Sequence, residues 1–331
     1  MGQSDYIKEI TRLALANDKN HLLETLYEFV DYSQKNNRAK FAAQLQSIIK
    51  ASARKEEIGK LKEIYNSQDM DNNSDNIILQ TVISSFQMKD LICLPEIKEE
   101  FEYFIKERKA ADSLSDMNIP VSNKIILHGP SGCGKTLAAY VLAGELQQPL
   151  IIVNLGAVVS SKLGETSKNL TKIFKKACYE KAIILLDEFD SLGKIRDYDQ
   201  DHGEMKRVVN TILQLFDFMS QNSIIIAATN QLQMIDDALI RRFDLSLKLD
   251  FPQADQVRSL IDRTINGRFT FDNIELKDSI IEKCHGISYY IIKRTLLNAI
   301  KRTILDGHTD NIIQTQIWKK LIFGEIKDVE G

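Results

Sequence analysis

Residues 129–136, GPSGCGKT, constrain the fold of this chain more than any other stretch. They fit the phosphate-binding pattern G-x-x-x-x-G-K-[ST] at every fixed position. The apolar residues 124–128 before them read as a buried strand, and residues 137–146 after them read as a helix. Strand, glycine-rich loop and helix in this order are the context that the pattern requires. The alternative is an ordinary glycine-rich turn, and the flanking elements make it the less favoured interpretation.

The residue types in this loop suit a triphosphate and its metal ion. Glycines let the backbone approach a phosphate and turn its N–H groups inward, and the helix N-terminus adds partial positive charge. The ammonium of Lys135 would lie on the β- and γ-phosphates, and the hydroxyl of Thr136 on Mg²⁺. The residues expected to bind the nucleotide are Gly129, Pro130, Ser131, Gly132, Cys133, Gly134, Lys135 and Thr136.

Two further buried strands end in polar residues that could complete such a site. Residues 182–188, AIILLDE, end in Asp187, expected to hold Mg²⁺ through water, and Glu188, expected to deprotonate the attacking water. Residues 223–230, SIIIAATN, end in Asn230, which could bond both the water and the γ-phosphate. The alternatives are a solvated acidic turn and a turn-forming asparagine.

Residues 236–244, DDALIRRFD, predict a short helix that is capped by an aspartate and ends at Arg241 and Arg242. Guanidinium groups stabilise charge on a transferring phosphoryl group, and a neighbouring subunit can supply them. The alternative role for these arginines is a surface ion pair with Asp244 or Asp236.

Apolar strands that alternate with helices predict a parallel sheet covered on both faces, and hence an α/β core. The expected strands are 124–128, 150–154, 182–187, 223–229 and 245–249. The expected domains are a helical N-terminal module of three helices at 1–66, a linker at 67–85, the core at 86–252 and an all-α domain at 253–331. The N-terminal module is either a helical extension packed on the core or a separate docking module, and the sequence leaves both open.

The composition excludes few functions, but it argues against nucleic acid and a membrane as partners. The 331 residues carry a net charge of −3, so no global positive field demands nucleic acid. The four cysteines lie far apart without metal-binding spacing and predict reduced thiols in the cytoplasm. No apolar run reaches membrane-spanning length, so no membrane is expected as a partner.

With these motifs in order, the chain resembles the AAA family of ATPases over about residues 86–300. GPSGCGKT resembles the Walker A motif, ILLDE Walker B, AATN sensor 1 and DALIRRFD the arginine-finger segment; LGETSKNLTKIF and the adenine-backing DLIC at 90–93 are also similar. The resemblance implies a P-loop ATPase core with a helical lid, and ATP and Mg²⁺ as cofactors. It also implies a homo-oligomeric ring, usually a hexamer, with ATP between subunits and Arg241 and Arg242 reaching the neighbour.

Three segments depart from the family pattern. In SSKLGE, Lys162 stands beside Leu163 at the expected substrate pore, where many members carry an aromatic residue. It is either a pore contact or an exposed loop lysine. The arginine segment lacks the usual Pro-Gly, and Tyr289 and Tyr290 in the lid replace small residues.

Three hypotheses for the substrate follow. A ring ATPase that remodels a protein, with a protease as one possible partner, is preferred because the N-terminal helical module is a typical docking site. A nucleic-acid-translocating or nucleic-acid-sensing ATPase is the alternative, since a ring of Lys162 ammonium groups could track phosphates. A regulatory switch that controls a partner enzyme without threading is the third.

Overall fold

The computed structural model describes residues 3–15, 19–35, 45, 78–155, 163–194, 202–219, 221–305 and 311–329. The chain divides into two compact units, Met1–Asp69 and Met70–Gly331. The first contains α1 (Gln3–Leu15) and α2 (Lys19–Lys35), which bury Leu13, Phe29 and Val30. The third helix predicted for this module lies, except for residue 45, outside the described residues, as does the predicted boundary at 66–67.

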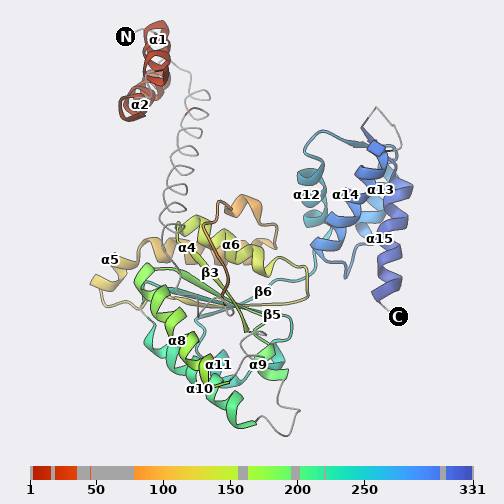
Figure 1. Ribbon diagram of the computed structural model, residues 1–331. Coiled ribbons are helices and arrows are strands. Elements are labelled where there is room, and N and C mark those ends of the chain that lie inside the picture. The colour runs from red at the N-terminus through yellow and green to blue at the C-terminus, as the bar shows by residue number, and fades with distance from the viewer. Residues whose placement is uncertain are drawn as a thin grey trace. The chain divides into compact units, whose positions relative to one another are not determined.

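The second unit is built on a six-stranded sheet with the order β1-β3-β4-β5-β2-β6 (Figure 1). Its strands are β1 (Ile78–Val82), β2 (Lys124–His128), β3 (Leu150–Asn154), β4 (Ile183–Asp187), β5 (Ile224–Thr229) and β6 (Leu245–Lys248). The five strands β2 to β6 pair in parallel, and all five lie where the sequence predicts them. The carboxyl ends of β2, β4 and β5 therefore meet at one edge of the sheet, where ligands bind in open α/β sheets.

Strand β1 corrects the predicted linker, because it lies within residues 67–85 and pairs antiparallel with β3. Among the described residues it occupies the sheet edge, where β3 is its single neighbour. Its sequence, ILQTV, places exposed Gln80 and half-buried Thr81 in the middle. A half-covered edge strand lacks the continuous apolar run that marks the central strands, so the sequence pattern does not reveal it.

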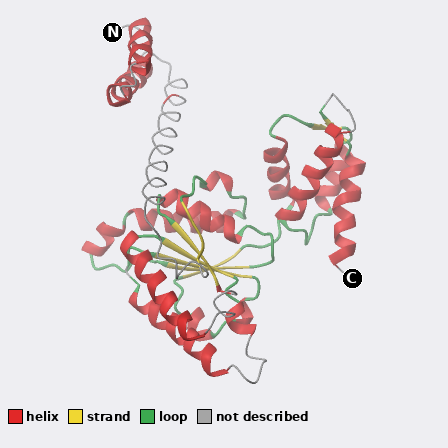
Figure 2. Cartoon of the chain, in the orientation of Figure 1, coloured by secondary structure: helices red, strands yellow, loops and turns green. Residues whose placement is uncertain are grey.

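Helices cover both faces of the sheet, and alternate strand residues point to opposite layers (Figure 2). One face packs against α8 (Leu163–Glu180) and α10 (His202–Phe218), which contribute Phe174 and Phe216. The other packs against α4 (Pro95–Lys109) and α6 (Lys135–Leu146). Shorter helices are η1 (Met88–Asp90), α5 (Ala111–Asp116), α9 (Ser191–Lys194), η3 (Leu232–Met234) and α11 (Asp237–Ile240).

The C-terminal part folds around a third apolar cluster that includes the fully buried Trp318. Its helices are α12 (Ala254–Ile265), α13 (Ile274–Glu282), α14 (Tyr289–Leu305) and α15 (Thr315–Val329). The expectation of an all-α domain is wrong in one detail. The strands β7 (Thr270–Phe271) and β8 (Ile312–Ile313) form a parallel pair. Two-residue strands are too short to produce a sequence period.

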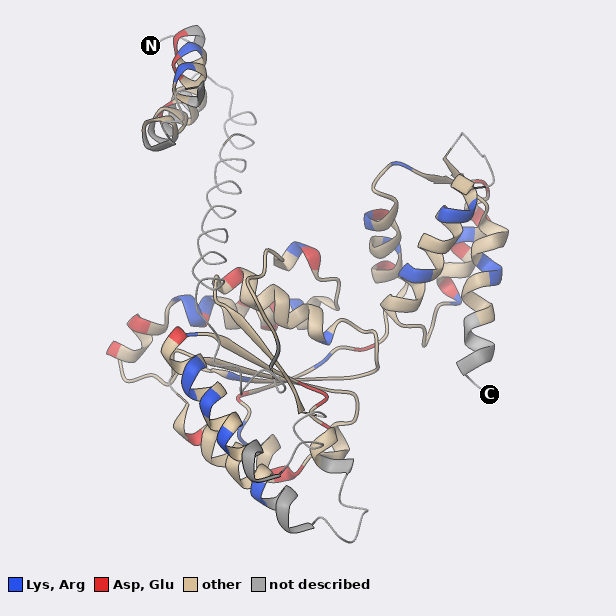
Figure 3. Cartoon of the chain, viewed as in Figure 1, with Lys and Arg blue, Asp and Glu red and all other residues tan. Residues whose placement is uncertain are grey.

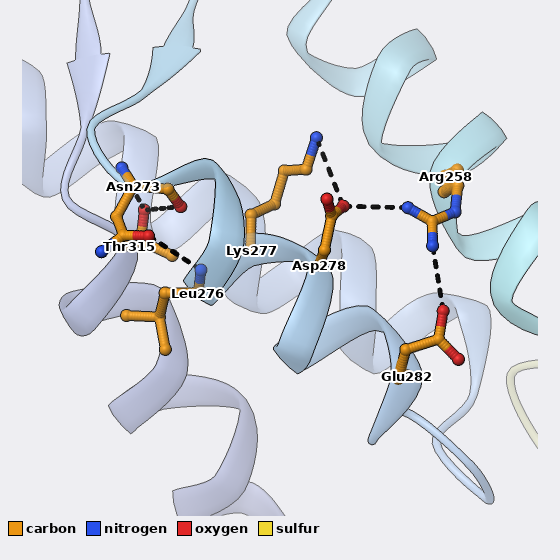
Figure 4. A network of polar contacts seen from close by, with 7 residues as sticks. All are labelled: Arg258, Asn273, Leu276, Lys277, Asp278, Glu282 and Thr315. Carbon is orange, nitrogen blue, oxygen red and sulfur yellow. Dashed lines mark hydrogen bonds and ion pairs between the residues drawn. The ribbon is translucent and has the colours of Figure 1, made fainter.

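Polar contacts join these C-terminal helices at their surface (Figure 4). Arg258 of α12 pairs with Asp278 and Glu282 of α13, at 2.9 Å in each case. The Asn273 side chain caps α13 by accepting a hydrogen bond from the Leu276 N–H at 2.8 Å. The ion pairs are partly exposed, so each contributes at most about 1 kcal/mol and orients the helices more than it stabilises them.

Among the described residues, no helix is long and apolar enough to cross a membrane.

Candidate functional site

The predicted phosphate loop joins β2 to α6 and depends on its glycines. Gly129, Gly132 and Gly134 have φ angles of 134°, 74° and 91°, a region that other residues rarely adopt. Space excludes side chains as well: a Cβ on Gly129 would lie 2.1 Å from the Leu249 carbonyl oxygen, and one on Gly132 2.7 Å from Ser288 Oγ. The loop therefore folds back tightly at the start of α6, which is the geometry of a backbone cradle for a phosphate.

Lys135, the first residue of α6, is buried beneath this loop. Its Nζ donates to the carbonyl oxygens of Gly129 and Pro130, both at 2.8 Å. Burial lowers the pKa of Lys135, while Cys133, Asp187 and Asp190 act in the opposite direction. Gly129 and Pro130 thus hold the lysine in place. They do not line the pocket described below, whereas the loop residues from Ser131 to Thr136 do.

Thr136 and Asp187, the two predicted metal residues, lie next to each other. The Thr136 hydroxyl donates to Asp187 Oδ2 at 3.3 Å, and the other carboxylate oxygen accepts from the Glu188 N–H at 2.9 Å. A hydroxyl and a carboxylate at this separation, beside a phosphate cradle, suit an octahedral Mg²⁺ that keeps several waters.

Glu188 has a left-handed backbone with a φ of 53°, which costs a non-glycine residue on the order of 1 kcal/mol. Two backbone hydrogen bonds hold the turn: Ser191 N–H to the Glu188 carbonyl at 2.8 Å, and Phe189 N–H to the Ala228 carbonyl of β5 at 2.9 Å. The side chain of Glu188 is exposed at the pocket. The fold therefore holds the backbone of Glu188 in an unfavourable conformation, as often occurs at functional positions.

Asp190 links this turn to Asn230, and sequence reasoning missed it. It is 2% exposed and accepts hydrogen bonds from the Thr229 hydroxyl at 3.1 Å and from the Asn230 N–H at 3.5 Å. The ends of β4 and β5 are thereby tied together. In the sequence, an aspartate in an acidic turn has the same appearance whether it is buried or solvated.

These residues surround a pocket of about 740 Å³, within the range typical of small-molecule sites. The predicted residues that line it are Ser131, Gly132, Cys133, Gly134, Lys135, Thr136, Asp187, Glu188 and Asn230. Asp90, Leu91 and Ile92 line it beside the loop, and the lid adds Leu260, Arg263, Thr264, Tyr289, Tyr290, Lys293 and Leu297. The lining combines the cations Lys135, Arg263 and Lys293 with apolar side chains such as Leu260 and Leu297, a mixture that suits a nucleoside triphosphate.

The lid touches the phosphate loop directly. The Tyr290 N–H donates to the Gly132 carbonyl at 3.2 Å, and burial raises the pKa of the neighbouring Tyr289. Leu260, Arg263, Thr264 and Leu297 carry no motif, and no sequence signal would have identified them as pocket residues.

Arg241 and Arg242 do not line the pocket and differ from each other. Nε and Nη2 of Arg242 bind the two carboxylate oxygens of Asp217 at 2.9 and 3.0 Å. Arg241 is exposed; its N–H donates to the Asp237 carbonyl at 3.0 Å, but no hydrogen bond or ion pair joins its side chain to another described residue.

The alternative ion pair with Asp244 or Asp236 is wrong, because both carboxylates hold backbone N–H groups instead. Asp236 caps α11 through the Ala238 N–H at 2.8 Å. Asp244 Oδ2 accepts from the N–H groups of Asn123 and Lys124 at 2.8 and 2.9 Å. The arginine turn is thus fixed to the start of β2.

The predicted pore residues remain untested. Lys162 lies outside the described residues, and Leu163 is described only as the first residue of α8.

Known proteins resemble this chain over the same region. Residues 125–251 match the model of the ATPase family associated with various cellular activities (AAA). An uncharacterized AAA family ATPase, y4kL, of Sinorhizobium fredii is 37% identical over 203 residues, covering 61% of this chain and 60% of the relative. The ATP-dependent zinc metalloprotease FtsH of Mesomycoplasma conjunctivae is 30% identical over 66% of this chain and 31% of its own length.

A putative 26S proteasome regulatory subunit homolog of Methanothermobacter marburgensis is 26% identical over 68% of this chain and 60% of its own length. The chain therefore spans 31% to 60% of these three relatives. The crystal structure of the FIGL-1 AAA domain superposes with a TM-score of 0.62 over 77% of this chain and 89% of that domain, at 19% identity, which shows the shared fold. Residues 125–251 of this chain therefore form a domain of the AAA family of ATPases, as the ordered motifs predicted.

Proposed function

We propose that this chain binds ATP with Mg²⁺ and hydrolyses it to ADP and phosphate. The proposal rests on one observation, which is that one pocket is lined by Lys135, Thr136, Asp187, Glu188 and Asn230. Lys135 neutralises the β- and γ-phosphates, and the glycine loop directs its N–H groups at them. When bound, Mg²⁺ supplies positive charge to the same phosphates.

The remaining side chains act on the attacking water. Glu188 accepts its proton, and Asn230 positions it against the γ-phosphate. Thr136 and Asp187 are the residues that would hold the metal ion, Asp187 through a water molecule. The proton is transferred to a carboxylate held by a hydrogen-bonded turn, so little reorganisation is needed during the reaction.

A second copy of the chain completes the site in this proposal, within a ring that is usually a hexamer in the family. Arg241 is the residue that enters the neighbouring pocket, because Arg242 is held by Asp217 on its own subunit. A cytoplasmic location stays a prediction from the cysteine pattern.

The proposed substrate or partner is a protein. Two relatives support it by name, one a metalloprotease and the other a proteasome regulatory subunit homolog. A partner protease is the specific form of this proposal.

A nucleic-acid-directed ATPase is the alternative, and one surface favours it. Exposed Lys168, Lys172 and Lys175 recur at helical spacing along α8, where Figure 3 shows several blue segments. A lysine row is also what a solvated helix face looks like, and the net charge of −3 gives it no wider positive field.

Stimulated turnover separates the two candidates. Phosphate release by the full chain is measured with Mg²⁺ alone, with an unfolded model protein and with a single-stranded oligonucleotide at 50 and 200 mM salt. A protein-directed enzyme is stimulated by the unfolded protein at both salt concentrations. Stimulation by the oligonucleotide alone, lost at high salt, would contradict the protein proposal, since phosphate contacts weaken steeply with salt. No Mg²⁺-dependent phosphate release under any condition would contradict hydrolysis itself.

A further inference from the structure

The two residues that we propose to act on the attacking water come from different strands. Glu188 directly follows β4, Asn230 directly follows β5, and both line the pocket. Both are exposed, so burial of their own side chains does not hold them in place. Contacts made by the neighbouring residues must therefore set the distance between them.

Asp190 makes such contacts from the β4 side. It is 2% exposed, and its Oδ1 accepts hydrogen bonds from the Thr229 hydroxyl at 3.1 Å and from the Asn230 N–H at 3.5 Å. The Thr229 hydroxyl, which is also buried, accepts in turn from the Gln231 N–H at 3.0 Å. Asp190 therefore holds the N–H groups of both Asn230 and Gln231, one directly and the other through Thr229.

The same network is connected to Glu188 through the backbone. Asp190 lies two residues after Glu188, and the Phe189 N–H between them donates to the Ala228 carbonyl of β5 at 2.9 Å. The turn after β4 and the end of β5 are thus joined by one backbone bond and by the buried carboxylate. Moving either segment would break these bonds.

The location of Asp190 limits what it can do. It does not line the pocket, so it does not touch the nucleotide. Burying a carboxylate costs free energy, which only hydrogen bonds and nearby positive charge offset. An aspartate kept in this place despite that cost must act through the residues that it contacts.

We infer that Asp190 is a positioning residue for hydrolysis, which acts through Thr229 to hold Asn230 at a fixed distance from Glu188. The inference rests on the proposed function, and adds the residue that sets the geometry around the attacking water. A displacement of about 1 Å near reacting groups can slow a reaction by about 10²-fold, so a small shift of Asn230 would be measurable.

A competing route runs through Lys135. Burial lowers the pKa of this lysine, and the charge of Asp190 is one of those that oppose the effect. Loss of that charge would weaken binding of the phosphates, whereas a shift of Asn230 would slow hydrolysis and leave binding intact. The two routes therefore predict different measurements.

The first experiment changes Thr229, because Asp190→Ala leaves buried partners unpaired and can unfold the chain. Thr229→Val removes the hydroxyl with little change in shape, and Thr229→Ser keeps it. Thr303→Val is the matched control, since Thr303 is also 1% exposed and its hydroxyl donates to the Ala299 carbonyl within α14.

We expect Thr229→Val to lower the kcat of the full chain by about tenfold or more, through displacement of Asn230. The Kd for a fluorescent ATP analogue should stay within about twofold, because the phosphate loop and Lys135 are unchanged. Thr229→Ser should restore most of the turnover, and Thr303→Val should leave kcat unchanged.

A double-variant cycle then tests whether the effect passes through Asn230. Thr229→Val should lower kcat in the unchanged chain but should have no further effect in an Asn230→Ala background, since the positioned side chain is already absent. Two losses that multiply would mean that Thr229 acts independently of Asn230, and would overturn the inference.

Two other results would also overturn it. One is Thr229→Val turning over like Thr303→Val; the other is a rise in Kd that matches the fall in turnover, which would assign the effect to Lys135. An unchanged chain that releases no phosphate would defeat the proposed function instead. Amide hydrogen exchange then judges the positioning separately: Thr229→Val should speed exchange at Asn230 and Gln231, and unchanged exchange would exclude it.

Discussion

At the scale of single residues, the site depends on carboxylates with different surroundings. Asp187 bonds Thr136, Glu188 stands in a left-handed turn at the pocket, and Asp190 is buried against Thr229. The three lie within four positions of one another, yet only Glu188 is exposed, whereas Asp187 is half-buried and Asp190 is buried. The division of roles therefore follows from burial and hydrogen bonding rather than from residue type.

Glu188→Gln should keep ATP binding and reduce hydrolysis by about 10²- to 10⁴-fold, because the amide cannot accept the proton of the attacking water. The loop, Lys135 and the Thr136–Asp187 pair stay intact, so the dissociation constant for ATP should change little. Single-turnover phosphate release and nucleotide binding measure the two effects separately. Glu99→Gln, an exposed change on α4, is the control and should leave both unchanged. Retained hydrolysis in Glu188→Gln would exclude Glu188 as the base.

At the scale of elements, helix α6 must fit under the segment that leads to η1. It carries the phosphate-loop lysine at its start and buries Gly144 near its end, where the Phe86 backbone crosses it. The Met88 N–H also donates to Glu145 of α6 at 3.0 Å. The segment that backs the pocket at Asp90–Ile92 is thus positioned by this crossing.

Gly144→Ala should destabilise the chain, although alanine in place of a helical glycine normally stabilises by about 1 kcal/mol. The added Cβ would lie 2.0 Å from the Phe86 carbonyl oxygen, so backbone must move. We expect a loss of about 1–3 kcal/mol, as for other overpacked sites. Chemical denaturation measures the change in free energy of unfolding.

Gly324→Ala on α15 is the matched control, since its Cβ would meet nothing within 4 Å. It should show the ordinary stabilisation. Equal effects from the two alanines would contradict the tight crossing of Phe86 over α6.

At the scale of the whole molecule, the arginine turn is built to present one guanidinium outward. Arg242 is tied to Asp217, and its hydrogen bond is the main cause of a lowered pKa for that carboxyl group. Arg241 has no such contact among the described residues. An exposed guanidinium without an intramolecular partner of this kind is what the proposed assembly requires of Arg241.

Arg241→Ala should lose turnover by about 10³-fold or more with ATP binding intact, the effect expected for an arginine supplied in trans. Arg242→Ala should have a smaller effect, because it removes a surface ion pair with Asp217 and a hydrogen bond to the Ala238 carbonyl, both within its own subunit. Steady-state hydrolysis of each variant, alone and mixed with Glu188→Gln, tests this order. Recovery in the Arg241→Ala mixture is expected; a larger loss in Arg242→Ala would reverse the assignment.

The sequence by itself determined the α/β core and the phosphate end of the pocket. Both features depend on residues that are consecutive in the chain. Glycine supplies the positive φ angles at Gly129, Gly132 and Gly134, and short apolar runs form the five buried parallel strands, so a local pattern is enough to predict them. Only the tertiary structure decided the antiparallel β1, the buried Asp190 and the pairing of Arg242 with Asp217. These depend on contacts between segments far apart in the chain, and the same residue types occur equally in solvated loops and surfaces.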